Sequence, residues 1–472
     1  MNIAIRTTLL TGAALALCAC DSSKDDAGDG SLQPLLSGFH AVPDMASITF
    51  LREEEAWSAL EFGDGTEFRS VDADQYDVNF DAVLPGDETG TCAGDVDADD
   101  VKDDDECTRL VSTSINVIAD HEYVVALLGH YGGLRVQVYD KPIHEFDTSD
   151  DDGDAEDETA EVQFFHWSDD LPALDVYLEP PGTNLSPVQV RATLATGEEF
   201  HTVVDDGAYV ITLTAVGDPS AALYTSETFS LTERTRVAFA IRAGAGNGTS
   251  PIKVSRFRDQ GGVLLDRRVR TELRFAHVGR EVGNVDVYAD EDFTQAFYAN
   301  VPFGTTSAYG EIASTAVTGL ELDVTPAGNP GVLLAREQID LARGERATFY
   351  LIGQLGSLDG LRLQDSSRRI ATHARVRLIN TATAGLDFFV VRTGSNINTL
   401  SPTTTLTAGT ASGVLSFDPE RYDIVMTKAG TDAVVFGPLA VDLAGGGIYT
   451  VAATASGDAS AANAVLLDDF AN

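Results

Sequence analysis

Hydrophobic and polar residues alternate along most of the chain, in short runs separated by turns rich in Gly, Pro, Asn and Asp. A period of two is typical of β-strands that bury one face and expose the other. A sustained apolar period of 3.6 residues does not appear in the sequence beyond the N-terminal segment Leu9–Leu17. The pattern therefore predicts an all-β protein.

One pattern of residues recurs four times, and each copy is expected to form a strand, a turn and a second strand. Two copies align without a gap from a histidine to the tripeptide Asp-Val-Tyr, whereas the others are a shorter and a degraded variant. The copies run from His40 to Phe50, from His166 to Tyr177, from His277 to Tyr288 and from Asn380 to Phe389. Such a repeat predicts tandem copies of one domain.

A tyrosine motif follows the opening of each copy except the third. The motif D-x-x-x-Y-x-[VI] contains Tyr76, Tyr209 and Tyr422. It resembles the tyrosine corner of immunoglobulin-like sandwiches, in which the phenol bonds to backbone just upstream. Each copy then closes with two runs rich in Val, Thr, Ile, Tyr and Phe. We therefore expect four tandem immunoglobulin-like β-sandwich repeats of about 100 residues each.

The repeat resembles a bacterial family known as domain of unknown function 4397. The family's opening is close to V-R-x-x-H-A-S-P-D-A-P-x-V-D-V-Y, and its middle is close to A-G-T-Y-x-[VI]. The matching residues are His166, Ser168, Asp170, Pro172, Asp175, Val176, Tyr177, Gly207 and Tyr209 in the second copy, and His277, Asp286, Val287 and Tyr288 in the third. The resemblance implies an exported, often anchored β-domain protein of unassigned biochemistry, and it implies no catalytic residues.

The N-terminus is typical of a lipoprotein signal. Arg6 precedes an apolar segment, Leu9–Leu17, which is too short to span a bilayer. Ala19 precedes Cys20, and the following residues are polar, so Cys20 resembles the acylated cysteine of a lipobox. A plain secretory signal cut near Ala19 is the alternative. Either signal predicts export.

The repeats and the composition between them predict the following division of the chain. We expect a signal peptide over 1–19, a tether over 20–34, a sandwich with an acidic insertion over 35–146, an acidic linker over 147–160, and further sandwiches over 161–258, 272–366 and 374–470.

The chain is strongly acidic. It carries 31 Lys and Arg against 74 Asp and Glu, a formal charge of −43. Nucleic acids bind through clustered basic residues, so this composition argues against a nucleic-acid partner. Arginines cluster in two later linkers, around Arg258 and around Arg368. One hypothesis is that the acidic linker folds back on these arginines, and the alternative is independent solvated linkers.

Two cysteines, Cys92 and Cys107, flank an acidic loop. A disulfide between them is expected outside the cytoplasm. Inside the loop, carboxylates occupy positions at which an EF-hand places its calcium ligands, namely Asp95, Asp97, Asp99, Asp103 and Glu106. Asp100 stands where the EF-hand needs a glycine, so a solvated acidic loop without metal is the alternative. Apart from this possible Ca²⁺, no cofactor is expected.

The recurring histidines admit two interpretations. His40, His166 and His277 share one position, with Asp175 and Asp286 nine residues after the last two. A repeated metal or acid–base pair is the functional interpretation. The structural one is that each histidine orients the following loop through hydrogen bonds, and it is favoured because the fourth copy has Asn380 there.

Three functions follow from these observations. The first is a non-enzymatic, lipid-anchored protein of the cell envelope, on its periplasmic face or at the cell surface. Its sandwiches would serve binding to an envelope protein or glycan, adhesion, or as a spacer. The second is a calcium-dependent binding module. The third is a hydrolase with a site between domains, although the sequence contains no G-x-S-x-G, P-loop or H-E-x-x-H motif.

Overall fold

The computed structural model confirms an all-β chain of tandem sandwiches. It describes residues 31–85, 87, 107–146, 158–246, 248–258, 261–313, 315–455 and 462–468. Over these ranges the only helices are two short 3-10 turns, η1 (Pro187–Gln189) and η2 (Ile397–Thr399). None of the described helices is long and apolar enough to cross a membrane.

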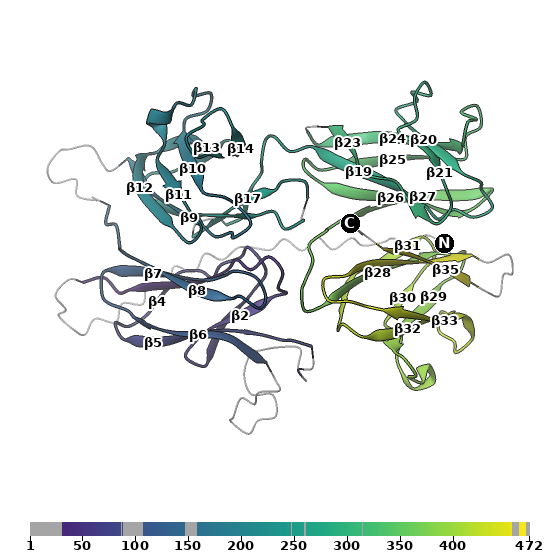
Figure 1. Ribbon diagram of the computed structural model, residues 1–472, viewed down its shortest axis with the longest axis horizontal. Coiled ribbons are helices and arrows are strands. Elements are labelled where there is room, and N and C mark those ends of the chain that lie inside the picture. The colour runs from purple at the N-terminus through teal and green to yellow at the C-terminus, as the bar shows by residue number, and fades with distance from the viewer. Residues whose placement is uncertain are drawn as a thin grey trace, which may run out of the picture.

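The strands fall into four successive units (Figure 1). Unit 1 contains β1 (Leu35–His40), β2 (Ile48–Arg52), β3 (Glu55–Leu60), β4 (Arg69–Ser70), β5 (Gln75–Ala82), β6 (Thr108–Asn116), β7 (His121–Leu128) and β8 (Arg135–Pro142). Unit 2 contains β9 (Thr159–His166), β10 (Leu174–Glu179), β11 (Ala192–Leu194), β12 (Glu199–Asp205), β13 (Gly207–Ala215), β14 (Ala222–Thr225), β15 (Phe229–Leu231), β16 (Arg236–Ala243), β17 (Ile252–Phe257) and β18 (Val263–Leu264).

The second half of the chain repeats this arrangement. Unit 3 contains β19 (Thr271–His277), β20 (Val285–Ala289), β21 (Tyr298–Val301), β22 (Thr305–Thr306), β23 (Gly310–Ala313), β24 (Val317–Pro326), β25 (Ala335–Leu341), β26 (Arg346–Gln354) and β27 (Ser357–Gln364). Unit 4 contains β28 (Ala374–Thr381), β29 (Leu386–Arg392), β30 (Thr404–Leu406), β31 (Thr410–Phe417), β32 (Arg421–Lys428), β33 (Val434–Asp442), β34 (Ile448–Ala455) and β35 (Ala462–Asp468).

Every unit is a sandwich of two sheets with the same topology. The first sheet has the order β4-β1-β7-β8, β12-β9-β16-β17-β18, β22-β19-β26-β27 or β31-β28-β34-β35. In each first sheet the opening strand runs parallel to the penultimate long strand, as β1 does to β7 and β9 to β16. The second sheet has the order β3-β2-β5-β6, β11-β10-β13-β14, β21-β20-β24-β25 or β30-β29-β32-β33. Each unit buries its own apolar core between its two sheets.

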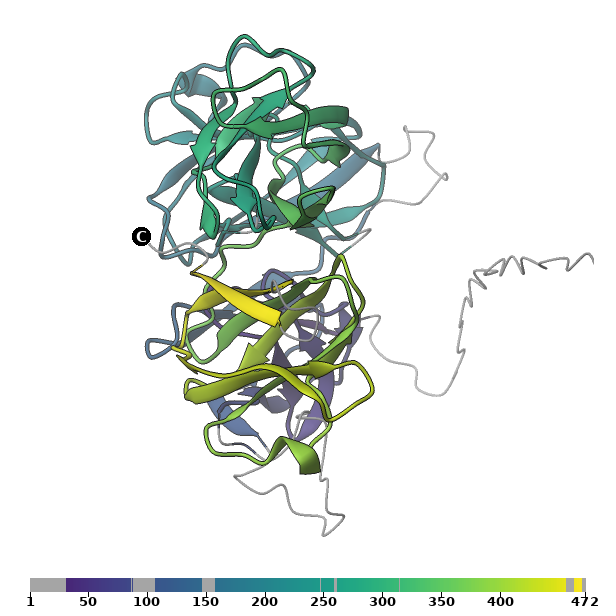
Figure 2. The ribbon, with the colours of Figure 1, turned by 90° about the vertical axis from the view of Figure 1, so that its right-hand side faces the viewer.

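The units also pack in pairs, through the outer faces of their first sheets (Figures 1 and 2). Along β16, Val237, Phe239 and Ile241 belong to the core of unit 2, whereas Ala238 and Ala240 point away from it. These two alanines join a separate apolar cluster that spans units 1 and 2. Its members are Phe39, Ala41, Phe68, Val124, Ala126, Leu128 and Tyr139 of unit 1, and Phe165, Trp167, Ala238, Ala240 and Phe257 of unit 2.

Aromatic rings occupy the middle of this first interface. The ring of Trp167 lies 4.4 Å from that of Phe39 and 4.5 Å from that of Phe165. Its indole N–H donates to the Tyr139 hydroxyl at 2.8 Å, and this hydroxyl donates to the Gly197 carbonyl at 3.1 Å. The polar ends of both aromatic side chains are therefore satisfied inside an apolar interface.

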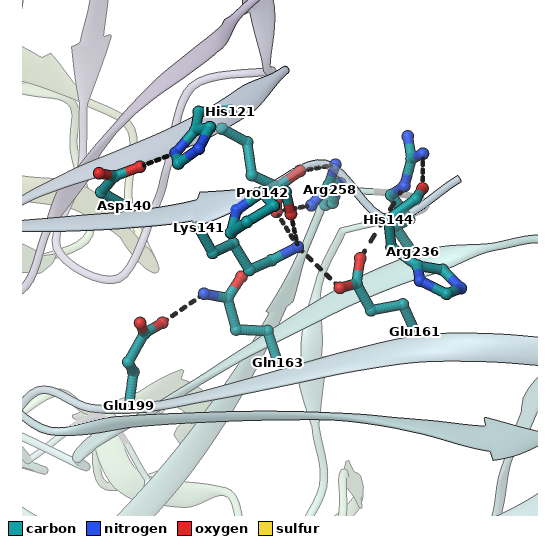
Figure 3. A network of polar contacts seen from close by, with 11 residues as sticks. His121, Asp140, Lys141, Pro142, His144, Glu161, Gln163, Glu199, Arg236 and Arg258 are labelled. Atoms are coloured by element: carbon teal, nitrogen blue, oxygen red, sulfur yellow. Dashed lines mark hydrogen bonds and ion pairs between the residues drawn. The ribbon is translucent and has the colours of Figure 1, made fainter. Parts of the chain in front are cut away.

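Buried charges at the edge of the first interface form a network (Figure 3). The Lys141 ammonium lies 2.8 Å from the Glu122 carboxylate of its own unit and 2.7 Å from the Glu161 carboxylate of unit 2. Arg258, which follows β17, donates to both oxygens of Glu122. Each ion has an opposite charge within reach, as burial in a region of low dielectric requires.

Units 3 and 4 pair through the equivalent faces. The cluster between them contains Ala276, Val278, Tyr350, Ile352, Leu361 and Leu363 of unit 3, and Ile379, Ala411, Ala452, Val465 and Leu467 of unit 4. Asp365 is the polar centre of this second interface. Its carboxylate accepts from the Tyr309 hydroxyl at 2.8 Å and pairs with the Arg377 guanidinium of unit 4 at 3.2 Å.

Loops at the centre of the molecule join the two pairs. In the linker between units 3 and 4, Arg368 donates to the carbonyls of Pro43 and Met45 in unit 1. The Ala371 amide donates to the Asp44 carbonyl at 2.7 Å, and the Ser367 amide to the Gly246 carbonyl of unit 2 at 2.9 Å. The four units thus form a closed two-by-two block (Figure 1).

We expect Phe39→Ala to lower the free energy of unfolding of the first pair by about 3–5 kcal/mol, as is usual for truncation of a buried phenylalanine. The Phe39 side chain is fully buried, and its ring contacts those of Trp167 and Phe257 across the interface. Urea unfolding followed by tryptophan fluorescence measures this effect, because Trp57 and Trp167, the two tryptophans of the chain, both lie in this pair. Val188→Ala, at a side chain 93% exposed, should change the value by less than about 0.5 kcal/mol. Equal midpoints for wild type and Phe39→Ala would contradict the pairing.

Candidate functional site

The recurring histidines hold the loop that follows each opening strand. The Nε2 atoms of His40, His166 and His277 lie 2.9, 2.9 and 3.0 Å from the carbonyls of Ala46, Pro172 and Gly283. In the fourth unit the Asn380 amide donates to the carbonyls of Ala384 and Leu406, both at 2.9 Å. All four side chains are fully buried at the C-terminal end of the first strand of their unit. Their position suits bracing of a loop.

Burial keeps these histidines neutral. It lowers the pKa of His40 to about 3, against the effect of the hydrogen bond to Ala46, and the nearby Arg368 and Arg242 lower it further. Burial also lowers the pKa of His166 and of His277. A neutral imidazole donates from Nε2 to the loop carbonyl, so the structure favours this protonation state.

The aspartates that follow the histidines bind elsewhere. The Asp175 carboxylate accepts from the Thr193 hydroxyl at 2.5 Å and from the Gly217 amide at 2.7 Å. Asp286 accepts from the amides of Asn300 and Gly328, both at 2.7 Å. Asp387 repeats the first arrangement with Thr405 and Gly430. Gly217, Gly328 and Gly430 all have positive φ, of 76°, 74° and 71°, so the aspartate fixes a left-handed turn in the second sheet. The repeated histidines and the aspartates that follow them thus bind different partners and form no dyad.

Two of the three predicted tyrosine corners have the expected hydrogen bond. The Tyr76 hydroxyl donates to the Asp72 carbonyl at 3.0 Å, and that of Tyr209 to the Asp205 carbonyl at 2.9 Å. The Tyr422 phenol instead bonds with the Arg392 side chain. In unit 3, which lacks the tyrosine, the Gly319 amide donates to the Asp340 carboxylate at 2.8 Å.

Several predicted site residues lie outside the described residues. They are Cys20, Cys92, Asp95, Asp97, Asp99, Asp103 and Glu106. Cys107 is described and is buried just before β6. The lipid anchor, the Cys92–Cys107 disulfide and the calcium loop therefore remain predictions. Within the described residues, no group of three or more His, Cys, Asp or Glu side chains is placed to hold a metal ion.

Cationic side chains gather where the four units meet. The guanidinium groups of Arg242 and Arg368 lie 4.6 Å and 4.8 Å from the centre of the Phe62 ring. Burial lowers the pKa of each arginine to about 10. Sequence reasoning found Arg368 among the linker arginines, but it missed Arg242, whose signal is a charge inside the apolar run of β16. Residues 147–157 of the expected acidic linker, 147–160, lie outside the described residues, and Arg258 pairs with Glu122.

A cleft of about 460 Å³ opens beside this centre, between units 2, 3 and 4. Unit 2 contributes residues from 248 to 269, unit 3 contributes 342–345 and the end of β27, and unit 4 contributes Arg377 and Val414. Lys253 lies in its wall, directly across the β16–β17 pair from Arg242. Burial, with the nearby Arg242, lowers the pKa of Lys253 to about 8. Sequence reasoning also missed Lys253.

The cleft bears on the hydrolase hypothesis. Its lining contains Ser250, Ser366, Asp266 and Asp365, which come from two units, but none of the described lining residues is a histidine. Asp266 accepts from the amides of Thr225 and Arg268 and from the Ser250 hydroxyl. These contacts bind the linker to unit 2.

Comparison with family models identifies the repeat. The model for domain of unknown function DUF4397 matches residues 34–177 and 271–389. The chain belongs to the DUF4397 family. Each DUF4397 match begins at the start of one unit and ends in the second strand of the next, and each stays within one face-to-face pair. The family match therefore recurs once per pair, and the resemblance expected from the histidine-to-tyrosine motif is confirmed.

Other comparisons add little to the DUF4397 assignment. A search of curated proteins finds no match. Among solved structures, the Bacillus anthracis TIE protein is 8% identical, with 92% of this chain and 75% of that chain covered and a TM-score of 0.14. The family CBM26 module CBMbc from Eubacterium rectale Amy13K, in complex with maltoheptaose, is 12% identical, with 43% and 98% covered and a TM-score of 0.16. At such scores neither likeness carries an argument.

We expect His40→Asn to remove part of the acid sensitivity of the first pair. The folded state keeps His40 neutral, whereas an unfolded histidine gains a proton below pH 6.5, so wild-type stability falls as the pH drops from 6.5 towards 3. The slope approaches 1.36 kcal/mol per pH unit only well below pH 6.5, so the stability advantage of wild type over His40→Asn should shrink by about 1.6 kcal/mol between pH 6.5 and pH 5. Urea unfolding at both pH values measures it. A difference that is the same at both would show that His40 does not titrate on unfolding.

Proposed function

We propose that this chain is a non-enzymatic, lipid-anchored protein of the cell envelope that presents four β-sandwiches as one rigid block for binding. The observation that carries the proposal is the burial of the outer faces of the first sheets in two face-to-face pairs. The central contacts of the linker between units 3 and 4 with units 1 and 2 fix these pairs relative to one another. A spacer made of independent units would need neither feature.

A rigid block suits binding because its surfaces are ordered before the ligand arrives. Association costs conformational entropy wherever a loop must become ordered, and a preformed site avoids that cost. The cleft between units 2, 3 and 4 has walls from three units, so it exists only while the units keep their places. Clefts between domains are also common ligand sites.

The anchoring half of the proposal predicts that Cys20→Ser releases the protein from membranes into the soluble envelope fraction. Two acyl chains give stable membrane binding, and the serine variant cannot be acylated at that position. Fractionation and mass spectrometry of the intact protein measure the change. Cys18→Ser is the matched control and should remain acylated and membrane-bound. A wild-type protein without fatty acid, or release by Cys18→Ser alone, would contradict an anchor at Cys20.

The rigid-block half predicts that Phe39→Asp enlarges the molecule without unfolding the units. A buried carboxylate without a partner is costly, so units 1 and 2 should separate. Small-angle scattering should show a larger radius of gyration than wild type, while circular dichroism keeps the β signal. Val188→Asp, at an exposed side chain, should leave the radius unchanged. A folded Phe39→Asp protein with the wild-type radius would contradict this half.

A further inference from the structure

Apolar side chains are exposed together in the cleft between units 2, 3 and 4. Val263 is 43% exposed, Leu265 47% and Val414 41%, and all three line this cleft. Val263 and Leu265 come from unit 2, whereas Val414 comes from β31 of unit 4. Grouped exposed apolar residues in a concave surface mark binding sites, whereas isolated ones are ordinary.

The charged residues of the cleft have ion-pair or hydrogen-bond partners, with one exception. Arg377 pairs with Asp365 at 3.2 Å, Arg343 with Glu227 at 2.8 Å, and Glu345 with Arg362. The Asp266 carboxylate accepts three hydrogen bonds, from two amides and the Ser250 hydroxyl. Lys253 is the exception, since no carboxylate of the described residues pairs with it and Arg242 is the charged group that acts on it.

An unpaired ammonium in a partly buried wall is an unfavourable arrangement for the protein alone. Burial disfavours the charged form, and the positive charge of Arg242 adds repulsion. An anion placed against Lys253 would stabilise the charged ammonium through a charge-assisted hydrogen bond, and so offset both the burial and the repulsion. The nearby apolar side chains offer no further charge to such a ligand. Its remaining part must therefore be apolar.

We propose that this cleft binds an amphipathic monoanion, with its anionic head on Lys253 and its apolar body against Val263, Leu265 and Val414. The volume of about 460 Å³ is within the range of small-molecule sites. The shared chemistry is one carboxylate on an apolar chain, whether it comes from a free fatty acid or from the membrane beside the anchor. This proposal deepens the binding role proposed above by naming a ligand class.

Dodecanoate below its micelle concentration is the probe, with dodecanol as its uncharged counterpart. The full chain carrying Cys20→Ser is used throughout, so no detergent competes and the result does not depend on anchoring. Isothermal titration calorimetry should show dodecanoate binding at least ten times more tightly than dodecanol. Lys253→Met should abolish this preference, Lys253→Arg should keep most of it, and Lys428→Met, at an exposed lysine of unit 4, should behave as wild type.

Proton uptake distinguishes a direct contact from a structural effect of the substitution. A lysine that titrates near pH 8 should take up about half a proton for each dodecanoate bound at that pH, because the anion favours its charged form. Titrations in buffers of different ionisation enthalpy measure the uptake, which should vanish in Lys253→Met. Absence of dodecanoate binding, equal affinity for dodecanol, or unchanged uptake in Lys253→Met would each overturn the proposal.

The source of the ligand is decided by a second arm. Neutral vesicles doped with dodecanoate are compared with the same concentration of free dodecanoate, for the acylated wild type and for Cys20→Ser. Tighter binding by the acylated protein alone indicates a membrane-derived ligand, whereas equal binding indicates a soluble one. A failure of anchoring leaves the calorimetry intact, so loss of the proposed function and loss of this inference are distinguishable.

Discussion

The outer face of each first sheet has to be covered, and the architecture follows from this constraint. The penultimate strand of each first sheet is apolar on both faces, as Val124–Leu128 in unit 1 and Val237–Ile241 in unit 2 illustrate. An isolated unit 2 would expose Phe165, Trp167 and Phe257 in one patch, which soluble domains rarely do. Pairing is thus a requirement of each unit's own sequence. Meeting it twice gives two pairs, which the central loop contacts join into one block.

The same constraint determines where polar residues lie. Charges that enter the first interface are held by opposite charges from both units, with Lys141 between Glu122 and Glu161. In the second interface, Asp365 of unit 3 forms the corresponding ion pair with Arg377 of unit 4. The two pairs share a topology but use different residues, since burial requires only that each ion be neutralised.

Local relations could be predicted from the sequence, and distant ones could not. Each histidine binds a carbonyl six residues further on, so both partners lie within the repeated motif and the contact could be predicted from it. The Asp175 partner is Gly217, and this pairing depends on the alignment of β10 with β13, which alternation does not specify. Alternation shows that a face is buried but not what covers it. The continuous apolar runs Val124–Leu128 and Val237–Ile241, which are typical of strands buried on both faces, were the available signal for the interfaces.

Buried cationic side chains gather at the centre of this strongly acidic chain. The protein carries a formal charge of −43, yet Arg242 lies close to both Arg368 and Lys253 inside it. Like charges in a region of low dielectric repel strongly, so each needs a ring, a carbonyl or an anion nearby. Phe62 and the carbonyls of Pro43 and Met45 serve Arg368, and Phe62 with the Ser255 hydroxyl serves Arg242. Among the described residues Lys253 has no such partner, and it faces the open cleft. A negatively charged ligand would therefore be stabilised more by the cleft between the units than by the loops at the ends of the sandwiches.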